Sequence, residues 1–330
     1  MFVLLGVILS GCGGSDSPSR DSAIEHELHQ LEAAKRARRL ADLKRKLHAE
    51  KARKARESIF QTPASDAGSK PKGLGSAGGG AGLGGFDELE ASLPGQAGLA
   101  IGPPGAGPAE SAGSLTTGSA WSTSKVLVAL RVLQQTGGPS GLSSQQADEI
   151  RRALTLSDNE AALSLFGDLE EAYDGPSGAA AAVDEVLAEA GDTTTHVSSI
   201  GRDGFTPFGQ TEWSLELQEL FMSQLAAGCV GSPASTSYVL DLMGEVSSDV
   251  WGLGSAGLSA RWKGGWGPDT DGRYLVRQMG VLETGGEETV VTLAALPDDG
   301  SFETGQSMAT AVARWAAERA PQFAAPIGRC

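Results

Sequence analysis

A low-complexity stretch, residues 61–85, limits this chain of 330 residues to one large folded domain. It consists mainly of Gly, Ser, Ala and Pro and ends in GSAGGGAGLGG. Such a composition cannot bury a hydrophobic core and is typical of a flexible linker. A single core rarely grows beyond about 250 to 300 residues. The sequence therefore predicts one globular domain over residues 86–330.

The first twelve residues, MFVLLGVILSGC, form an apolar run that ends at Cys12. The run is too short to span a bilayer but suits the apolar part of a signal segment. Residues 9–12, LSGC, resemble the lipobox of bacterial lipoproteins, which implies lipid attachment to Cys12. That resemblance implies an extracytoplasmic protein of the cell envelope, anchored to the membrane by its N-terminal lipid. No basic residue precedes the run, so an ordinary apolar N-terminus remains the alternative.

Residues 13–60 are predicted to be a polar tether followed by a charged helix. No Gly or Pro occurs between residues 23 and 60, and an incomplete apolar stripe recurs with helical spacing. This pattern indicates an exposed helix or a weakly associating coiled coil. Residues 25–57 contain 11 basic and 6 acidic residues, a balance suited to anionic headgroups or wall polymers. A solvated spacer is the alternative.

The predicted globular domain is strongly acidic. From Asp87 onward the chain has 12 basic and 32 acidic residues, which argues against nucleic acid as a partner. No cluster of His, Cys and carboxylates has the spacing of a metal site, so neither metal nor another cofactor is predicted. If the chain is exported, Cys229 and Cys330 are a possible disulfide pair. Two unpaired thiols are the alternative, because sequence does not fix their separation.

Hydrophobic periodicity predicts an α+β domain. Strands are predicted over residues 96–101 and 110–115, as a pair of edge strands, and over residues 258–266, 273–283 and 288–295. Helices are predicted over residues 122–134, 143–153, 160–169, 179–190, 214–227, 234–246 and 305–317.

Scarce residue types mark three short motifs inside this domain. Only two lysines follow residue 72, Lys125 and Lys263, and Asn159 is the only asparagine of the chain. They lie in STSK (residues 122–125), SDN (157–159) and KGG (263–265). This order of motifs is typical of active-site serine acyl-transfer enzymes.

The STSK motif pairs a hydroxyl with a candidate base. A serine becomes a nucleophile only when a base accepts its proton, and residues three apart share a helix face. Lys125 is therefore predicted to project beside Ser122 from the start of a helix. Burial or the charge of Lys263 would lower the pKa of Lys125. A surface Ser and Lys on a helix is the alternative.

The other two motifs add a relay and a substrate anchor. Ser157 could pass a proton to the leaving group, while Asn159 holds Lys125 and a substrate carbonyl; the alternative is an ordinary helix N-cap. Gly264 and Gly265 indicate close approach of a ligand or backbone to a strand. The N–H of Trp266 would then complete an oxyanion hole with that of Ser122. A strand bulge with an exposed lysine is the alternative.

Together the motifs resemble the superfamily of class A β-lactamases and penicillin-binding proteins. Residues 120–126, AWSTSKV, and 274–280, YLVRQMG, are similar to its secreted actinobacterial members. The resemblance implies a β-lactamase/transpeptidase-like fold, in which an antiparallel sheet of N- and C-terminal strands packs with a helical lobe. It implies catalytic roles for Ser122, Lys125, Ser157 and Lys263. The implied partner is a small β-lactam or a peptidoglycan-type peptide.

Three departures from that family concern the site. The interval from Ser122 to Ser157 is short, which predicts a reduced helical lobe. Gly264 replaces the family's Thr or Ser, so recognition of a carboxylate is weaker by about 1 to 3 kcal/mol. Residues 189–213 lack the E-x-x-L-N pattern, although they contain four carboxylates: Glu189, Asp192, Asp203 and Glu212. Slow deacylation is therefore predicted.

Two functional hypotheses follow. The first is a lipid-tethered serine hydrolase of the cell envelope, with slow acyl-enzyme hydrolysis or DD-peptidase-like activity. The second is a catalytically silent lipoprotein that uses the same fold as a wall-binding or scaffold module. His196, the only histidine of the domain, is predicted to be structural, with a role as general base as the alternative.

Overall fold

The computed structural model describes residues 81–326, except residues 106–108, 203 and 248–249. These residues belong to the second of two compact units, Gly75–Cys330. The predicted signal segment with Cys12, the tether, the basic coiled-coil helix and most of the linker lie outside the described residues. Cys330 also lies outside them. The predictions made for these segments stay predictions.

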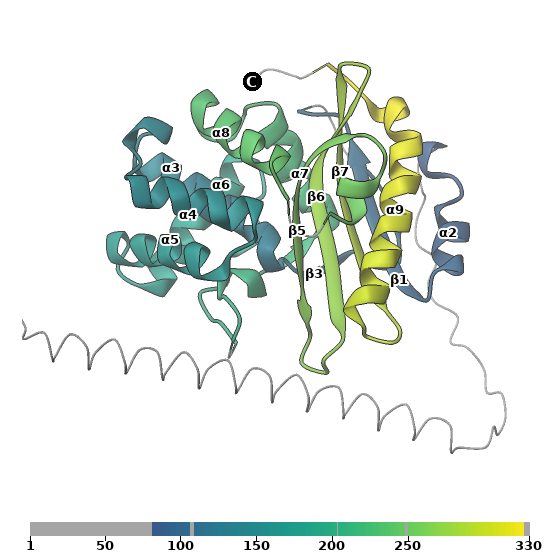
Figure 1. Cartoon of the computed structure of the whole chain (residues 1–330), viewed down its shortest axis with the longest axis horizontal. Coiled ribbons are helices and arrows are strands. Elements are labelled where there is room, and N and C mark those ends of the chain that lie inside the picture. The colour runs from purple at the N-terminus through teal and green to yellow at the C-terminus, as the bar shows by residue number, and fades with distance from the viewer. Residues whose placement is uncertain (1–80, 106–108, 203, 248–249, 327–330) are drawn as a thin grey trace, which may run out of the picture. The chain divides into compact units, whose positions relative to one another are not determined.

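The domain is built on a five-stranded antiparallel sheet with the strand order β2-β1-β7-β6-β5 (Figure 1). The strands are β1 (Gly95–Gly102), β2 (Glu110–Gly113), β5 (Ser259–Pro268), β6 (Tyr274–Thr284) and β7 (Glu287–Pro297). N-terminal and C-terminal strands therefore share one sheet, as predicted. The edges are β2 and β5. The expectation that β1 is also an edge strand is wrong, because β1 lies between β2 and β7 and pairs with both.

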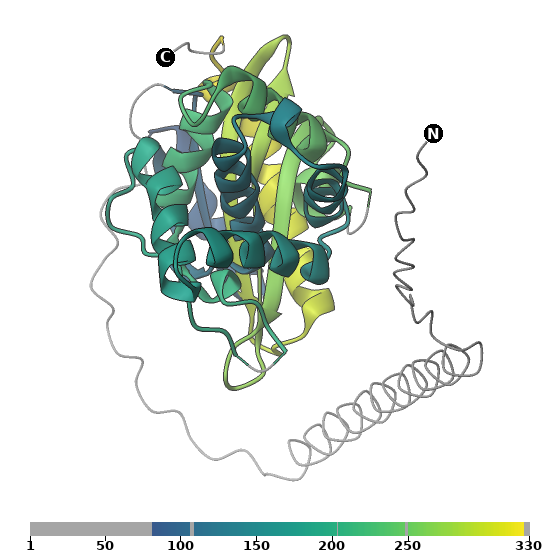
Figure 2. The same cartoon turned by 90° about the vertical axis from the view of Figure 1, so that its left-hand side faces the viewer.

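Helices cover both faces of the sheet. Helix α9 (Phe302–Phe323) packs on one face and α7 (Leu215–Ala226) on the other (Figures 1 and 2). The alternation along β7 explains this arrangement, since successive side chains of a strand point to opposite faces. Leu293 and Ala295 belong to the apolar cluster under α9, whereas Ala294 packs with Leu215 of α7.

A helical lobe lies beyond α7 (Figure 1). It contains α3 (Lys125–Gln135), α4 (Ser144–Thr155), α5 (Asn159–Ala172), α6 (Pro176–Glu189) and α8 (Pro233–Gly244). Ser143 begins α4 with a capping box, in which its hydroxyl accepts from the Gln146 N–H and the Gln146 side chain returns to the Ser143 backbone. No helix in the described part of the chain is long and apolar enough to cross a membrane.

The structure adds elements that the periodicity did not predict. Helix α2 (Phe86–Ser92) is held by Phe86, whose ring meets that of Trp315 edge-on at 5.2 Å. Strands β3 (Thr117–Ser119) and β4 (Glu212–Ser214) form a separate two-stranded sheet. The helix predicted to begin at residue 122 begins at Lys125, because residues Trp121–Ser124 form a 3-10 turn, η2.

Candidate active site

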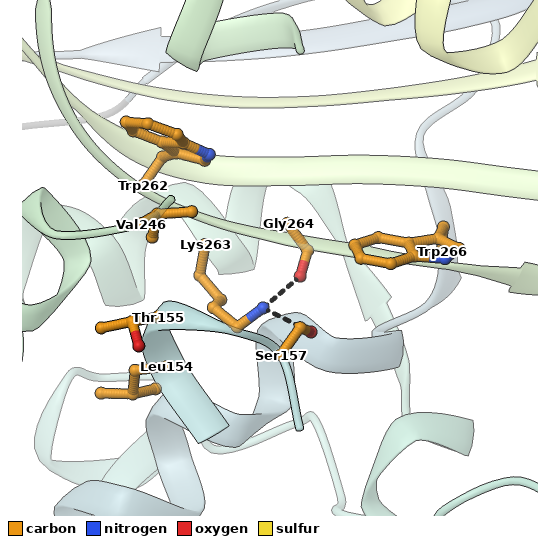
Figure 3. Close-up of a pocket in the computed structure, with 8 residues that line it drawn as sticks. All are labelled: Leu154, Thr155, Ser157, Val246, Trp262, Lys263, Gly264 and Trp266. Carbon is orange, nitrogen blue, oxygen red and sulfur yellow. Dashed lines mark hydrogen bonds between the residues drawn. The ribbon is translucent and has the colours of Figure 1, made fainter. Parts of the chain in front are cut away.

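Two ammonium groups from distant parts of the chain meet at Ser157. Lys125 Nζ, at the start of α3, donates to the carbonyl oxygen of Ser157 at 2.5 Å and lies 3.5 Å from its hydroxyl. Lys263 Nζ, on the edge strand β5, donates to the same hydroxyl at 2.9 Å and to the Gly264 carbonyl at 2.7 Å (Figure 3). The first and third motifs are therefore joined through the second.

Asn159 completes the contacts of Lys125. Its side-chain oxygen accepts a hydrogen bond of 2.7 Å from Lys125 Nζ. The neighbouring Asp158 is the N-cap of α5, where its carboxylate accepts from the backbone N–H groups of Glu160 and Ala161. The N-cap and the functional interpretation of the SDN motif are thus compatible, because different residues of the motif carry them.

Burial makes Lys125 a plausible proton acceptor. Its side chain is 1% exposed, and loss of hydration lowers the pKa of its ammonium to about 7, although the charge of Asp158 acts in the opposite direction. Asp158 is itself held by Arg152, whose guanidinium donates to it at 2.6 Å. A lysine with such a pKa is partly neutral near neutral pH and can accept a proton.

The hydroxyl of Ser122 lies in the η2 turn beside this cluster. Ser122 and Asn159 line the same cavity, and no hydrogen bond to the Ser122 hydroxyl occurs among the described residues. The structure therefore contains no Ser122–Lys125 hydrogen bond, since the lysine is oriented toward Ser157 and Asn159. A nucleophile–base hydrogen bond that is absent without substrate can still form when one is bound.

Glycines let β5 approach this turn closely. A Cβ on Gly265 would lie 2.8 Å from the Ser122 nitrogen and 2.9 Å from the Ala120 carbonyl oxygen. A Cβ at this position would therefore collide with backbone atoms. Gly264 differs, because a Cβ there would lie 3.6 Å from the Trp251 ring and 3.7 Å from that of Trp266. Close approach of backbone is thus the reason for Gly265 but not for Gly264.

Two residues of the site have left-handed backbone conformations. Trp121 has φ of 49° and Ser157 has φ of 56°, a region that residues other than Gly seldom occupy. Trp121 immediately precedes Ser122, and Ser157 contacts both ammonium groups. Such conformations cluster at functional sites because the surrounding contacts must maintain them.

A buried arginine, Arg277, supports the η2 turn through hydrogen bonds. Arg277 on β6 is 1% exposed, and burial lowers the pKa of its guanidinium to about 10 despite the charge of Glu212. It donates to the Gly118 carbonyl and to Gln218 Oε1, both at 2.7 Å. Gln218 in turn donates to the Thr123 hydroxyl at 2.9 Å. The sequence singled out Arg277 only by resemblance and missed Gln218, a polar residue on a largely apolar helix.

The carboxylates of residues 189–213 have other contacts. Glu189 accepts from Gln134 and from the Gly231 backbone, Asp192 from the Thr195 backbone, and Glu212 from Ser119. Asp203 lies outside the described residues.

His196 is also directed away from the cluster. Its side chain is 78% exposed and contacts Asp184 at 3.1 Å. Among the described residues, no group of His, Cys, Asp and Glu has the arrangement of a metal site. Cys229 is disulfide-bonded; because Cys330 lies outside the described residues, their pairing stays a prediction.

Two adjoining cavities border the site and share Trp266. The larger has a volume of about 160 Å³ and is lined by Trp121, Ser122, Asn159, Gly204, Phe205, Thr206, Trp266, Gly267, Pro268 and Tyr274. The smaller is lined by Leu154, Thr155, Ser157, Val246, Trp262, Lys263, Gly264 and Trp266 (Figure 3). Neither set contains a carboxylate. Among the described residues, the geometry therefore offers a hydroxyl, two cations and a carboxamide, but no carboxylate in the lining of either cavity to activate water.

Solved structures with a similar fold include β-lactamases and PBP-A. A β-lactamase from Burkholderia vietnamiensis is 17% identical, with TM-score 0.58, over 73% of this chain and 97% of that chain. An ancestral class A β-lactamase (GNCA) is 22% identical, with TM-score 0.54, over 71% and 97% of the two chains. A mutant of PBP-A, solved as an acyl-enzyme complex with penicillin G, is 17% identical, with TM-score 0.56, over 71% and 93%.

These likenesses establish the architecture of the domain. No protein-family model matches the chain, and no curated protein matches it in sequence. The domain has the fold of class A β-lactamases and of PBP-A, as the sequence predicted.

Proposed function

We propose that this domain is a serine hydrolase that is acylated at Ser122 by a β-lactam or a peptidoglycan-type peptide. One observation supports the proposal above the others. Buried Lys125 and Lys263 converge on the Ser157 hydroxyl, next to the cavity that Ser122 lines. Two buried cations are difficult to explain as packing, because desolvation of each charge is unfavourable.

The acylation step can be assigned to the residues of this cluster. Neutral Lys125 accepts the proton of Ser122, whose oxygen forms a bond to the substrate carbonyl carbon. The backbone N–H groups of Ser122 and Trp266 stabilise the negative charge on the carbonyl oxygen. The carbon–nitrogen bond of the substrate then breaks, and Ser157 donates its proton to the departing nitrogen. Ser157 regains a proton from Lys125, and Lys263 attracts an anionic group of the substrate.

Hydrolysis of the acyl-enzyme is proposed to be slow. That step requires a water molecule activated by a base, and no described carboxylate lines either cavity at the site. Lys125 is then the base that the described lining and contacting residues offer. Persistent acylation distinguishes this proposal from efficient destruction of antibiotics.

The direct test is intact-protein mass spectrometry after incubation with benzylpenicillin. We expect a mass increase equal to one penicillin, located by peptide mapping at Ser122, that decays over minutes to hours. Ser122→Ala should show no increase. Ser124→Ala is the matched control, because the Ser124 hydroxyl is buried and donates to the Trp121 carbonyl at 2.6 Å. An unlabelled, folded wild-type protein would contradict the proposal and favour the silent scaffold.

We also propose that the chain is anchored to the outer face of a membrane by lipid on Cys12. The support is the LSGC sequence after an apolar run. Labelling of cells with an alkyne fatty acid should modify the wild-type protein but not Cys12→Ala. Equal labelling of the two proteins, or none in either, contradicts this anchor.

A further inference from the structure

The larger cavity at the site has aromatic walls from four separate segments. Trp121 comes from the η2 turn, Phe205 from the loop before β4, Trp266 from β5 and Tyr274 from β6. No charged side chain lines this cavity in the described part of the chain. Its volume is about 160 Å³, and an engineered apolar cavity of about 150 Å³ in another protein binds benzene. One aromatic ring therefore fits.

Arg202 contacts two of these walls, Trp121 and Phe205, and the end of β5. Its Nη2 donates to the Pro268 carbonyl at the end of β5 at 2.5 Å, and its Nε donates to Gln210 at 2.6 Å. Its guanidinium also lies 4.8 Å from the ring centre of Phe205 and 5.4 Å from that of Trp121. The loop, the turn and the strand end are thus fixed relative to one another before any ligand binds.

The remaining two aromatic walls are also supported from behind. Trp266 stacks on Phe302 with ring centres 5.5 Å apart, and Tyr274 lies 5.7 Å from the same ring. The rings of the other two walls, Trp121 and Phe205, meet edge-on with their centres 5.4 Å apart. A preformed pocket loses little entropy on binding, so it favours ligands that match its shape and polarity.

We propose that this cavity binds an uncharged aromatic group on the acyl side of the substrate. The inference rests on the proposed function, in which Ser157 protonates the leaving group. The leaving side then lies toward Ser157 and Lys263, which contact each other, and the acyl side occupies the larger cavity, which Ser122 and Asn159 line. Aromatic rings pair favourably at separations of about 4.5 to 7 Å. A carboxylate or ammonium group would lose hydration there, and no charged side chain among the described lining residues would replace that hydration.

Three penicillins test this selectivity, because they share the reactive ring system. Benzylpenicillin carries a phenylacetyl group, 6-aminopenicillanic acid lacks it, and carbenicillin adds a carboxylate to it. We expect the second-order rate constant of acylation to be at least about tenfold higher for benzylpenicillin than for either other compound. Equal rates for the three compounds in the wild-type protein would overturn the inference.

Variants locate the selectivity in the cavity. Phe205→Ala should reduce the preference for benzylpenicillin over 6-aminopenicillanic acid by about tenfold, the size expected when one aromatic contact is lost. Tyr238→Ala, an aromatic truncation on α8 outside both cavities, is the control and should keep the preference. A preference that is unchanged in Phe205→Ala contradicts the assignment.

A binding measurement separates this inference from the proposed catalysis. If no penicillin acylates the wild-type protein, the proposed function fails, but the cavity can still be tested without a reaction. Phenylacetylglycinamide should quench or shift tryptophan fluorescence of Ser122→Ala, because Trp121 and Trp266 line the cavity. Acetylglycinamide should not do so at the same concentration. Equal responses to the two amides would overturn the inference whatever the outcome with penicillins.

Discussion

Lys263 donates a 2.9 Å hydrogen bond to the hydroxyl of Ser157, although 106 residues separate them in the chain. Lys125 contacts the same residue from the other side. Ser157 therefore provides a polar contact between the sheet and the helical lobe. Its left-handed backbone lets one residue present both its carbonyl and its hydroxyl to these cations.

The pH dependence of acylation should report the pKa of Lys125. Burial lowers this pKa to about 7, and only the neutral amine accepts the Ser122 proton. The rate constant with benzylpenicillin should therefore rise with pH through about 7 and level off above it. Lys125→Arg should remain unacylated, because arginine stays protonated. A rate that is constant from about pH 5 to pH 9 would exclude Lys125 as the base.

Gly264→Thr should improve recognition of substrates that carry a carboxylate. A Cβ at this position meets only ordinary contacts at 3.6 to 3.7 Å, and Gly264 lines the same cavity as Lys263. One new hydrogen bond to a charged group is worth about 1.5 to 3 kcal/mol, which predicts an increase of about tenfold or more in the acylation rate constant. Gly264→Val is the matched control, since it has the shape of threonine without the hydroxyl. Equal gains in both variants would assign the effect to packing.

Gly265→Ala should have the opposite effect. Its methyl group would lie 2.8 Å from the Ser122 nitrogen, so β5 and the η2 turn must move apart. We expect acylation to fall by at least about a hundredfold, the effect of losing one oxyanion-hole donor. Thermal unfolding monitored by circular dichroism should still show a cooperative transition. Near-normal acylation in this variant would show that the strand and the turn need not approach so closely.

Stability should fall as pH rises because of Glu219, a residue outside the site. Glu219 is 3% exposed, and burial raises the pKa of its carboxyl to about 8. Between about pH 4.5 and pH 8, the folded state therefore keeps a proton on Glu219 that the unfolded state, with a pKa near 4.5, has already released. The stabilisation is fully present below about pH 4.5 and is lost as pH rises through about 8, with a slope of up to about 1.4 kcal/mol per pH unit.

Glu219→Gln tests this relation by removing the titration. Urea unfolding across this pH range should show the variant gaining stability relative to the wild type as pH increases. Glu216→Gln, an exposed residue of the same helix, is the control. If the free energy of unfolding changes with pH in the same way for the wild type and Glu219→Gln, the Glu219 carboxyl is not the cause of the pH dependence.

The sequence predicted the long elements well, because their apolar residues repeat with a clear period. Strands β5, β6 and β7 were predicted near their observed positions, since ten or more residues of each carry the pattern. Strands β3 and β4 have three residues each, too few for any periodicity to appear. Helix α2 depends on Phe86 meeting Trp315, a contact between residues far apart in sequence.

The site was predicted as a set of residue types, but its contacts were not. Scarcity of lysine and asparagine pointed to Lys125, Asn159 and Lys263, which the structure brings together through Ser157. The orientation of Lys125 away from Ser122 depends on tertiary hydrogen bonds that no local spacing encodes. Gln218 and the aromatic lining supplied by Phe205 also went unnoticed, because each acquires its role only from neighbours distant in the chain.

The contacts of Lys125 and Lys263 also matter for how the parts of the domain hold together. Lys263 belongs to the edge strand of the sheet, while Ser157 lies between two helices of the lobe. Lys263 therefore also joins the sheet to the helical lobe, and Lys125 joins α3 to the start of α5 within the lobe. Loss of either lysine in an inactive homologue would therefore remove structural hydrogen bonds as well as a group of the proposed mechanism.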